Sequence, residues 1–156
     1  MNLQSLKPSD LEKLFLEGIV PEPQHLIGSW RGIFLPFHEK APVPLKDIST
    51  SVVSKTWGAI WKGKEIFLDQ KTSKIKGINI VSGFRTLGFN VKKIKSRVDS
   101  GEAIEFDYSG NLFPLGLIRD EVRMVKGVED QKLIGVMFLE FFAVNVPVIF
   151  FGLERI

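Results

Sequence analysis

Hydrophobic and polar positions alternate with a period of two through most of the chain after residue 65. Because successive side chains of a β-strand point to opposite faces, this period predicts strands rather than helices. We expect strands over residues 65–69, 74–80, 91–98, 103–108, 117–125, 132–142 and 148–154, and an earlier one over 30–35. Short polar turns such as Ser100-Gly101 separate them, and a meander of this length tends to close on itself. The chain is therefore predicted to be mainly β, with a single antiparallel β-barrel of about eight or more strands.

One or two helices are expected toward the N-terminus. Ser9 and Glu12 have the spacing of a capping box, and an apolar stripe follows until Gly18. A second helix is predicted from about Leu45 to Ile60, with apolar residues along one side.

The apolar run from Leu133 to Leu153 has two interpretations. Its 21 residues contain Glu140 as the one ionisable group, and a helix of that length can span a bilayer. The alternative is a pair of buried strands joined around Asn145-Val146-Pro147. Val, Ile and Phe favour strands, and a carboxylate in the middle of a membrane span is costly. The hairpin is therefore the prediction.

With 156 residues, the chain is expected to form one domain. Its parts are an N-terminal helix and linker (1–24), a glycine- and tryptophan-containing block (26–69) and a strand-rich block (74–156). The absence of cysteine excludes disulfides and thiolate chemistry. The first residues lack the features of a secretory signal, so a cytoplasmic location is expected.

Two motifs carry a resemblance to a known family. The first is Gly28-Ser29-Trp30-Arg31-Gly32, and the second is the segment 61–67, Trp-Lys-Gly-Lys-Glu-Ile-Phe. With later segments at 118–123, 133–137 and 150–155, the chain resembles the GXWXG family with its associated uncharacterised C-terminal block. The resemblance implies a calycin-like barrel, similar to lipocalin-like and nitrobindin-like barrels, and it implies no particular reaction.

Cofactor and metal chemistry are not expected. Nitrobindin-like barrels hold haem through a histidine, but His25 and His38 both precede the main run of strands. Haem is therefore not expected, and two histidines without cysteine make a transition-metal site improbable. No catalytic motif occurs in the chain, so binding is favoured over enzymatic activity.

Asp120 is the most unusual candidate residue, because it shares the expected inward face of its strand with apolar neighbours. A buried carboxylate needs a partner, which we expect to be Arg31, Arg123 or Arg155. Asp120 is then a polar hook for a ligand, a general acid or base, or half of a structural ion pair. The full set of candidate ligand-binding residues is Trp30, Arg31, Trp57, Trp61, Asp120, Arg123 and Met137.

Charge is distributed unevenly along the chain. Residues 55–97 contain eleven Lys and Arg residues and only two acidic ones, a local balance of +9 within a net charge of +3. Lys93, Lys95 and Arg97 are expected to project from one strand face and to attract anions or an acidic lipid surface. Nucleic acid is disfavoured, since few aromatic residues alternate with the basic ones.

The predicted function is reversible binding of a hydrophobic small molecule inside the barrel. An anionic head group on this molecule is left open. Two alternatives stay open. The first is a small enzyme that acts through Asp120 with an arginine. The second is a peripheral membrane or protein-interaction module that uses the basic region 55–97. Adjacent phenylalanines in the last two strands also leave a homodimer open, because one of each pair must point outward.

Overall fold

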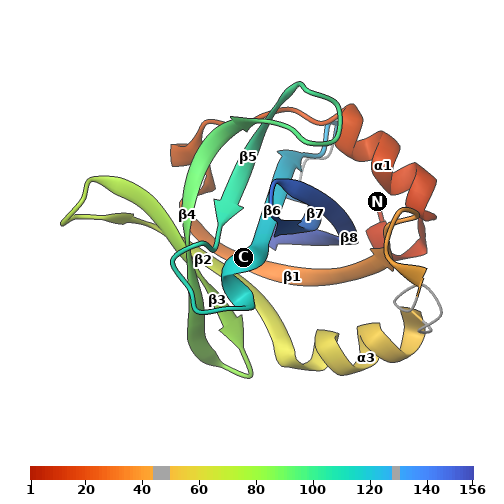
Figure 1. Ribbon diagram of the computed structural model, residues 1–156, viewed down its shortest axis with the longest axis horizontal. Helices are drawn as coiled ribbons and strands as arrows, with labels where there is room; N and C mark the ends of the chain where they lie inside the picture. Colours follow the sequence, from red (N-terminus) through yellow and green to blue (C-terminus); the bar gives the residue numbers. More distant parts are fainter. Residues whose placement is uncertain (44–49, 128–130) are drawn as a thin grey trace.

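The computed structural model describes residues 1–43, 50–127 and 131–156, and eight antiparallel strands of this part close into one barrel (Figure 1). Each strand pairs with its neighbours in the sequence, and β1 also pairs with β8 to close the barrel. The strands are β1 (Gly28–Phe37), β2 (Trp61–Asp69), β3 (Lys74–Val81), β4 (Phe84–Lys95), β5 (Glu102–Asp107), β6 (Ile118–Met124), β7 (Lys132–Phe141) and β8 (Val144–Arg155). The prediction of a mainly β, antiparallel barrel is confirmed.

In the part of the chain that the structure describes, two α-helices and three short 3₁₀ helices accompany the barrel. The α-helices are α1 (Pro8–Leu16) and α3 (Thr50–Ile60), and the 3₁₀ helices are η1 (Leu3–Ser5), η2 (Pro23–Leu26) and η3 (Leu115–Leu117). Helix α1 covers the outer face of the barrel, where its Leu11 and Phe15 are fully buried. Helix α3 leads directly into β2 at one end of the barrel (Figure 1).

The helix boundaries differ in detail from the sequence expectations. The predicted capping box is wrong, because Lys7 is the N-cap and Ser9 lies inside α1. Pro8 begins this helix instead, since its missing N–H needs no partner in the first turn. The second helix ends at Ile60 as predicted, whereas its expected start at residues 45–49 lies outside the described residues.

The C-terminal apolar run forms the predicted hairpin, but its turn is elsewhere. Phe142 and Ala143 make the turn, both with positive φ, and Pro147 lies within β8. The ladder shifts register between Met137 and Phe138, and Phe138 stands opposite Pro147. This irregularity accommodates Pro147, which has no backbone N–H to donate to the ladder. Among the described helices, none is both long and apolar enough to cross a membrane.

β4 begins at Phe84, seven residues before the predicted start at 91. Its first half was missed because the ladder with β3 shifts register beside Asn79, and Leu87 adopts a positive φ. Such a bulge interrupts the strict alternation by which a strand is recognised in a sequence.

The two glycines of the GXWXG motif leave room for large side chains. A Cβ atom at Gly32 would lie 2.6 Å from the ring of Trp61, and at Gly28 it would lie 3.3 Å from the guanidinium of Arg155. Between them, Trp30 fills one end of the barrel. Its indole N–H donates to the Leu26 carbonyl at 2.7 Å, and Arg155 lies over its ring. The motif therefore closes this end of the barrel with a packed ring.

Replacing Trp30 should test this closure. Its ring is 1% exposed, so Trp30→Ala should lower the free energy of unfolding by about 3–5 kcal/mol through lost burial and a residual cavity. Denaturant unfolding measures the change. Trp57 is 55% exposed, and Trp57→Ala should change the same quantity by only about 0.5 kcal/mol. Equal losses for the two variants would contradict the packing role of Trp30.

Candidate functional site

A cavity of about 190 Å³ occupies the end of the barrel opposite Trp30. Its walls come from the strand ends on that side, together with α3. Most of the lining is apolar, and one cluster of polar side chains interrupts it. The lining residues are Phe34, Trp57, Trp61, Lys64, Asn79, Val81, Leu87, Tyr108, Ile118, Asp120, Met137, Ile149 and Phe151.

Lys64 lies at the centre of the polar cluster. Its side chain projects inward from β2 and is 3% exposed. The ammonium donates to Asn79 Oδ1 at 2.8 Å, to the Tyr108 hydroxyl at 2.5 Å and to Asp120 Oδ2 at 3.1 Å. An ammonium has three protons, so these hydrogen bonds use its full donor capacity.

The remaining groups of the cluster are bonded to one another. The Tyr108 hydroxyl donates to Asp120 Oδ2 at 3.0 Å and accepts from Asn79 Nδ2 at 3.0 Å. Asn79 Nδ2 also donates to the Leu87 carbonyl, and Asn79 Oδ1 accepts from the indole N–H of Trp61. Buried polar groups are costly unless they are paired, and this network pairs the groups of Lys64, Asn79 and Tyr108.

One polar atom of the cluster has no hydrogen bond. Asp120 Oδ2 takes both bonds to the carboxylate, whereas Oδ1 accepts none from any described residue. This oxygen keeps some accessible surface, in contrast to the sealed Glu105 Oε2. Since Asp120 lines the cavity, its Oδ1 is a hydrogen-bond acceptor available to a ligand there.

Aromatic rings surround the Lys64 ammonium. Five ring centroids lie between 5.0 and 5.5 Å from its Nζ, within the range of cation–π attraction. They belong to Trp61, Phe89, Phe106, Tyr108 and Phe151. These rings stabilise the cation where water is excluded.

Inward-facing glycines make space for three of these rings. A Cβ atom at each glycine would lie within 2.6 Å of the ring concerned. The pairs are Gly32 with Trp61, Gly77 with Phe89, and Gly135 with Phe151. The second glycine of the GXWXG motif therefore belongs to the construction of the cage around Lys64.

Burial changes the acid–base properties of this cluster. Burial lowers the pKa of the Lys64 ammonium from its usual value, and the charge and hydrogen bond of Asp120 offset part of that shift. Burial, reinforced by the Asp120 charge, raises the pKa of the Tyr108 hydroxyl well above 10.0. Tyr108 is therefore held as a neutral hydrogen-bond donor to Asp120.

The structure brings together four of the seven predicted ligand-binding residues. Trp57, Trp61, Asp120 and Met137 line the cavity. The other three, Trp30, Arg31 and Arg123, do not.

Strand alternation separates the predicted arginines from Asp120. Arg31 follows the inward Trp30 and therefore points outward, where it pairs with Glu154. Arg123 points outward from β6 to Asp99 and to the carbonyl of Phe15 at the end of α1. The expected arginine partner of Asp120 is thus wrong, and its partner is Lys64.

Sequence reasoning missed Lys64, Asn79 and Tyr108. A signal existed for two of them. Residues two apart in a strand point to the same face, and Lys64 lies two residues before the buried Ile66 while Tyr108 lies two residues after the buried Phe106. A lysine on the apolar face of a strand is the feature that points to this site.

The basic residues at the end of β4 and just after it are not a uniform cationic face. Arg97 contacts Glu105 and Glu121, whose side chains are 2% and 0% exposed, at 2.6 and 2.9 Å. Lys93 pairs with Glu22 at 2.8 Å. Lys95 is exposed to solvent. Two of the three predicted anion-binding residues are therefore already paired with carboxylates.

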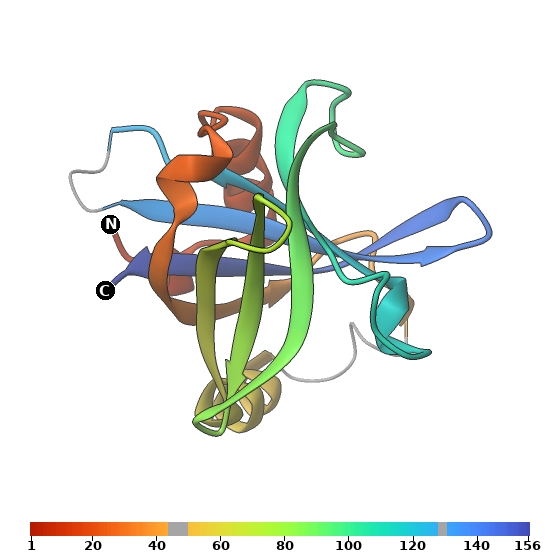
Figure 2. The same cartoon turned by 90° about the vertical axis from the view of Figure 1, so that its left-hand side faces the viewer.

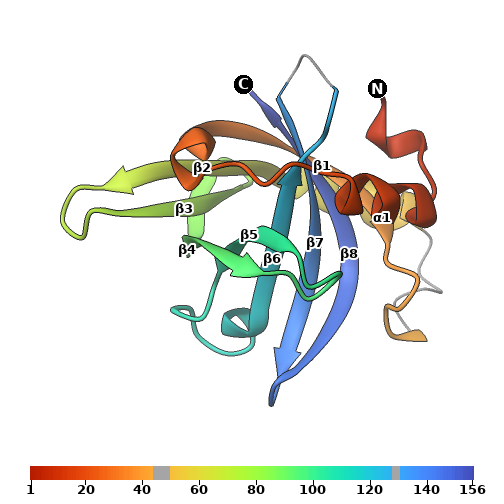
Figure 3. The same cartoon turned by 90° about the horizontal axis from the view of Figure 1, so that it is seen from above.

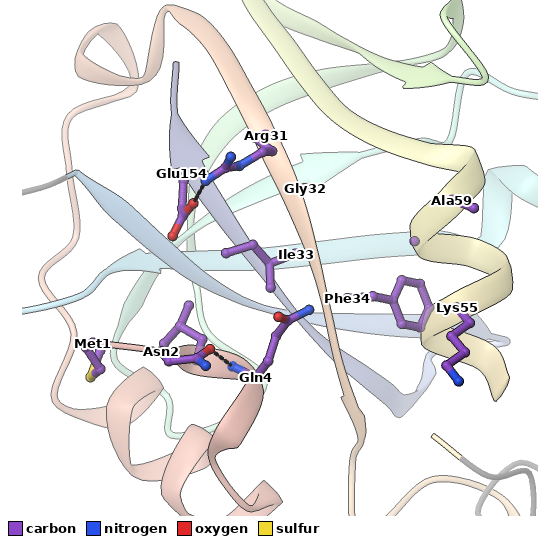
Figure 4. Close-up of a pocket in the computed structure, with 12 residues that line it drawn as sticks. Met1, Asn2, Gln4, Arg31, Gly32, Ile33, Phe34, Lys55, Ala59 and Glu154 are labelled. Atoms are coloured by element: carbon purple, nitrogen blue, oxygen red, sulfur yellow. Dashed lines mark hydrogen bonds and ion pairs between the residues drawn. The ribbon is translucent and has the colours of Figure 1, made fainter. Parts of the chain in front are cut away.

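A second and larger hollow is a groove outside the barrel, with a volume of about 580 Å³ (Figure 4). It lies between the N-terminal residues and α3, with β1 as its floor. Arg31 and Glu154 at its edge bind each other (Figure 4). The groove contains no buried polar group directed at a ligand, so the interior cavity is the stronger candidate site.

Comparisons of the chain with protein-family models, with curated proteins and with solved structures find no match. The resemblance to the GXWXG family therefore stays a prediction. Within the part of the chain that the structure describes, no three His, Asp or Glu side chains converge to hold a metal ion. The function has to be inferred from the geometry of the cavity.

The protonation of Tyr108 can be measured without labels, because it is the one tyrosine of the chain. In an ultraviolet titration, phenolate absorbance should be absent from the native protein at pH 10.0, where free tyrosine is half ionised. Since the folded pKa lies above the unfolded one, the associated stability is complete below pH 10.0 and declines as pH rises toward the folded value. Phenolate formation near pH 10.0 in protein that keeps its strand signal in circular dichroism would contradict the buried network.

Proposed function

We propose that the protein reversibly binds a small hydrophobic molecule inside the barrel, and that Asp120 Oδ1 accepts a hydrogen bond from its polar end. The observation that carries this proposal is one accessible acceptor at the base of an apolar cavity whose other polar groups are bonded to one another. Binding sites commonly combine apolar walls with a few polar groups that orient the ligand.

Charge favours a neutral ligand with a donor group over the anionic one that the sequence left open. The ammonium of Lys64 already has three partners, including Asp120. A ligand carboxylate would place a second negative charge beside Asp120 and would have to displace one of those bonds. A hydroxyl group or an N–H can instead use Asp120 Oδ1 without disturbing the ion pair.

The volume of the cavity limits the size of the enclosed part of the ligand. An apolar cavity of about 150 Å³ in another protein holds a benzene molecule, and the cavity here is about 190 Å³. We infer that it encloses about one ring or a short alkyl chain. A longer molecule would extend through the mouth beside Trp57.

A series of one-ring compounds with different head groups tests the ligand class. Benzyl alcohol should bind more tightly than toluene by about tenfold or more, because a hydrogen bond to a carboxylate is worth about 1.5–3 kcal/mol. Benzoate should bind most weakly. Calorimetry gives the affinities, and the NMR signal of the Trp61 indole N–H reports whether the ligand is in the cavity. Tightest binding by benzoate would favour an anionic ligand and contradict the proposal.

Asp120→Asn should change which head groups the cavity distinguishes. The amide oxygen will face the Lys64 ammonium and the Tyr108 hydroxyl, as Oδ2 does now, so its NH₂ group will take the place of Oδ1. The wild type should prefer benzyl alcohol, which donates, to acetophenone, which only accepts, and the variant should lose this preference because its NH₂ group can donate to the oxygen of either. Met137→Trp, which fills the cavity from its wall, should abolish binding of both. An unchanged order of affinities in a folded Asp120→Asn variant would show that Oδ1 does not contact the ligand.

A further inference from the structure

Exposed aromatic and aliphatic side chains lie at the end of the barrel that holds the cavity, and we call this group the apolar rim. It consists of Trp57, Phe84, Leu112, Phe113 and Phe142. Their exposed fractions are 55%, 76%, 88%, 82% and 104%, in that order. Side chains of this kind are normally buried, and a group of them on a surface marks an interaction site.

The topology places the apolar rim at one end of the barrel. In an antiparallel barrel the β3–β4 turn, the β5–β6 loop and the β7–β8 turn lie at the same end. They carry Phe84, Leu112 with Phe113, and Phe142, respectively. Figures 2 and 3 show the β5–β6 loop and the β7–β8 turn projecting on the side opposite the two termini. Helix α3 leads into the first residues of β2, which lie at this end of the barrel as well.

Exposed aromatic side chains are confined to this end. Throughout the described residues, every exposed Phe or Trp belongs to the apolar rim or is Phe141, which precedes Phe142 at the same turn. The exposed apolar residues of the opposite end, such as Leu68 and Ile156, are aliphatic. The asymmetry coincides with the open end of the cavity.

The segments that carry the apolar rim are positively charged, and the acidic residues that border them, Asp107 and Glu140, are paired with basic side chains. Segments 55–62, 82–86, 108–117 and 141–146 carry Lys55, Lys62 and Arg85, and no acidic residue. Arg85 pairs with Glu65, while the exposed Lys55 and Lys62 form no ion pair with a described residue. Exposed apolar side chains beside lysines that form no ion pair with a described residue complement a surface that has negative charges on its outside and an apolar layer beneath them.

We propose that the apolar rim docks onto the surface of an anionic lipid bilayer, with its aromatic tips inserted at the level of the head groups. The rim residues lie on separate elements, namely α3, the start of β4 after the β3–β4 turn, the β5–β6 loop and the β7–β8 turn, so each can insert independently into a fluid interface. Aromatic rings are favoured at membrane interfaces, and lysines near them are attracted to acidic lipids. Docking turns the mouth of the cavity toward the bilayer. A hydrophobic ligand then passes between lipid and barrel without crossing water, a consequence that rests on the proposed function.

Flotation with vesicles of phosphatidylcholine, with and without phosphatidylserine, tests the docking surface. The wild-type protein should bind the mixed vesicles, and Phe113→Ser combined with Phe142→Ser should weaken binding by at least tenfold. Lys55→Glu and Lys62→Glu should each weaken it by about fivefold or more. Fluorescence of the exposed Trp57 should shift to shorter wavelength when vesicles are added.

Matched variants at the opposite end are the controls. Leu68→Ser and Lys95→Glu change an exposed apolar residue and an exposed lysine away from the mouth, and both should bind vesicles as the wild type does. Equal losses in these controls, or no vesicle binding by the wild type at low salt, would overturn the proposal. A rim-dependent dimer in sedimentation, without vesicle binding, would instead assign the surface to a second copy of the chain.

The test separates docking from ligand binding. The folded Phe113→Ser, Phe142→Ser variant should keep its affinity for benzyl alcohol, because neither side chain lines the cavity. Asp120→Asn should keep its vesicle binding, because Asp120 is buried. A protein that binds vesicles but none of the one-ring compounds would support docking and count against the proposed function alone. Loss of vesicle binding in Asp120→Asn would overturn docking through the rim.

Discussion

The ion pair between Lys64 and Asp120 is the constraint around which the barrel interior is arranged. Taking two opposite charges out of water is costly unless further hydrogen bonds satisfy both groups. Tyr108 and Asn79 supply those bonds, and five aromatic rings surround the ammonium. Three of these rings in turn require inward-facing glycines, among them Gly32 of the GXWXG motif. A short sequence motif is thereby linked to a polar site on distant strands.

The two ends of the barrel have different roles in this arrangement. Trp30 and Arg155 close one end with a packed ring and a guanidinium stacked on it. The other end holds the cavity, whose base is the polar cluster, and it carries the apolar rim. One accessible acceptor inside and exposed aromatic tips outside are both consistent with a hydrophobic ligand that is exchanged with a lipid surface.

The sequence was sufficient for the fold and for part of the site. Period-two alternation located the strands, and it placed Asp120 correctly on the inward face of β6. It could not identify the partner of Asp120, because Lys64 lies on β2, which does not pair with β6. Contacts across a barrel leave no spacing pattern in the chain. The turn at Phe142-Ala143 was missed for another reason, because neither residue is a usual turn former.

The central claim, that Asp120 Oδ1 receives the donor group of a ligand, is tested most directly by a crystal structure of the protein soaked with a one-ring alcohol. We expect the ring among the apolar walls of the cavity and the hydroxyl oxygen about 2.5–3.0 Å from Asp120 Oδ1. The bond between Lys64 and Asp120 Oδ2 should stay intact. An alcohol bound to Lys64 after that pair has opened, or bound only in the groove beside Arg31, would contradict the account.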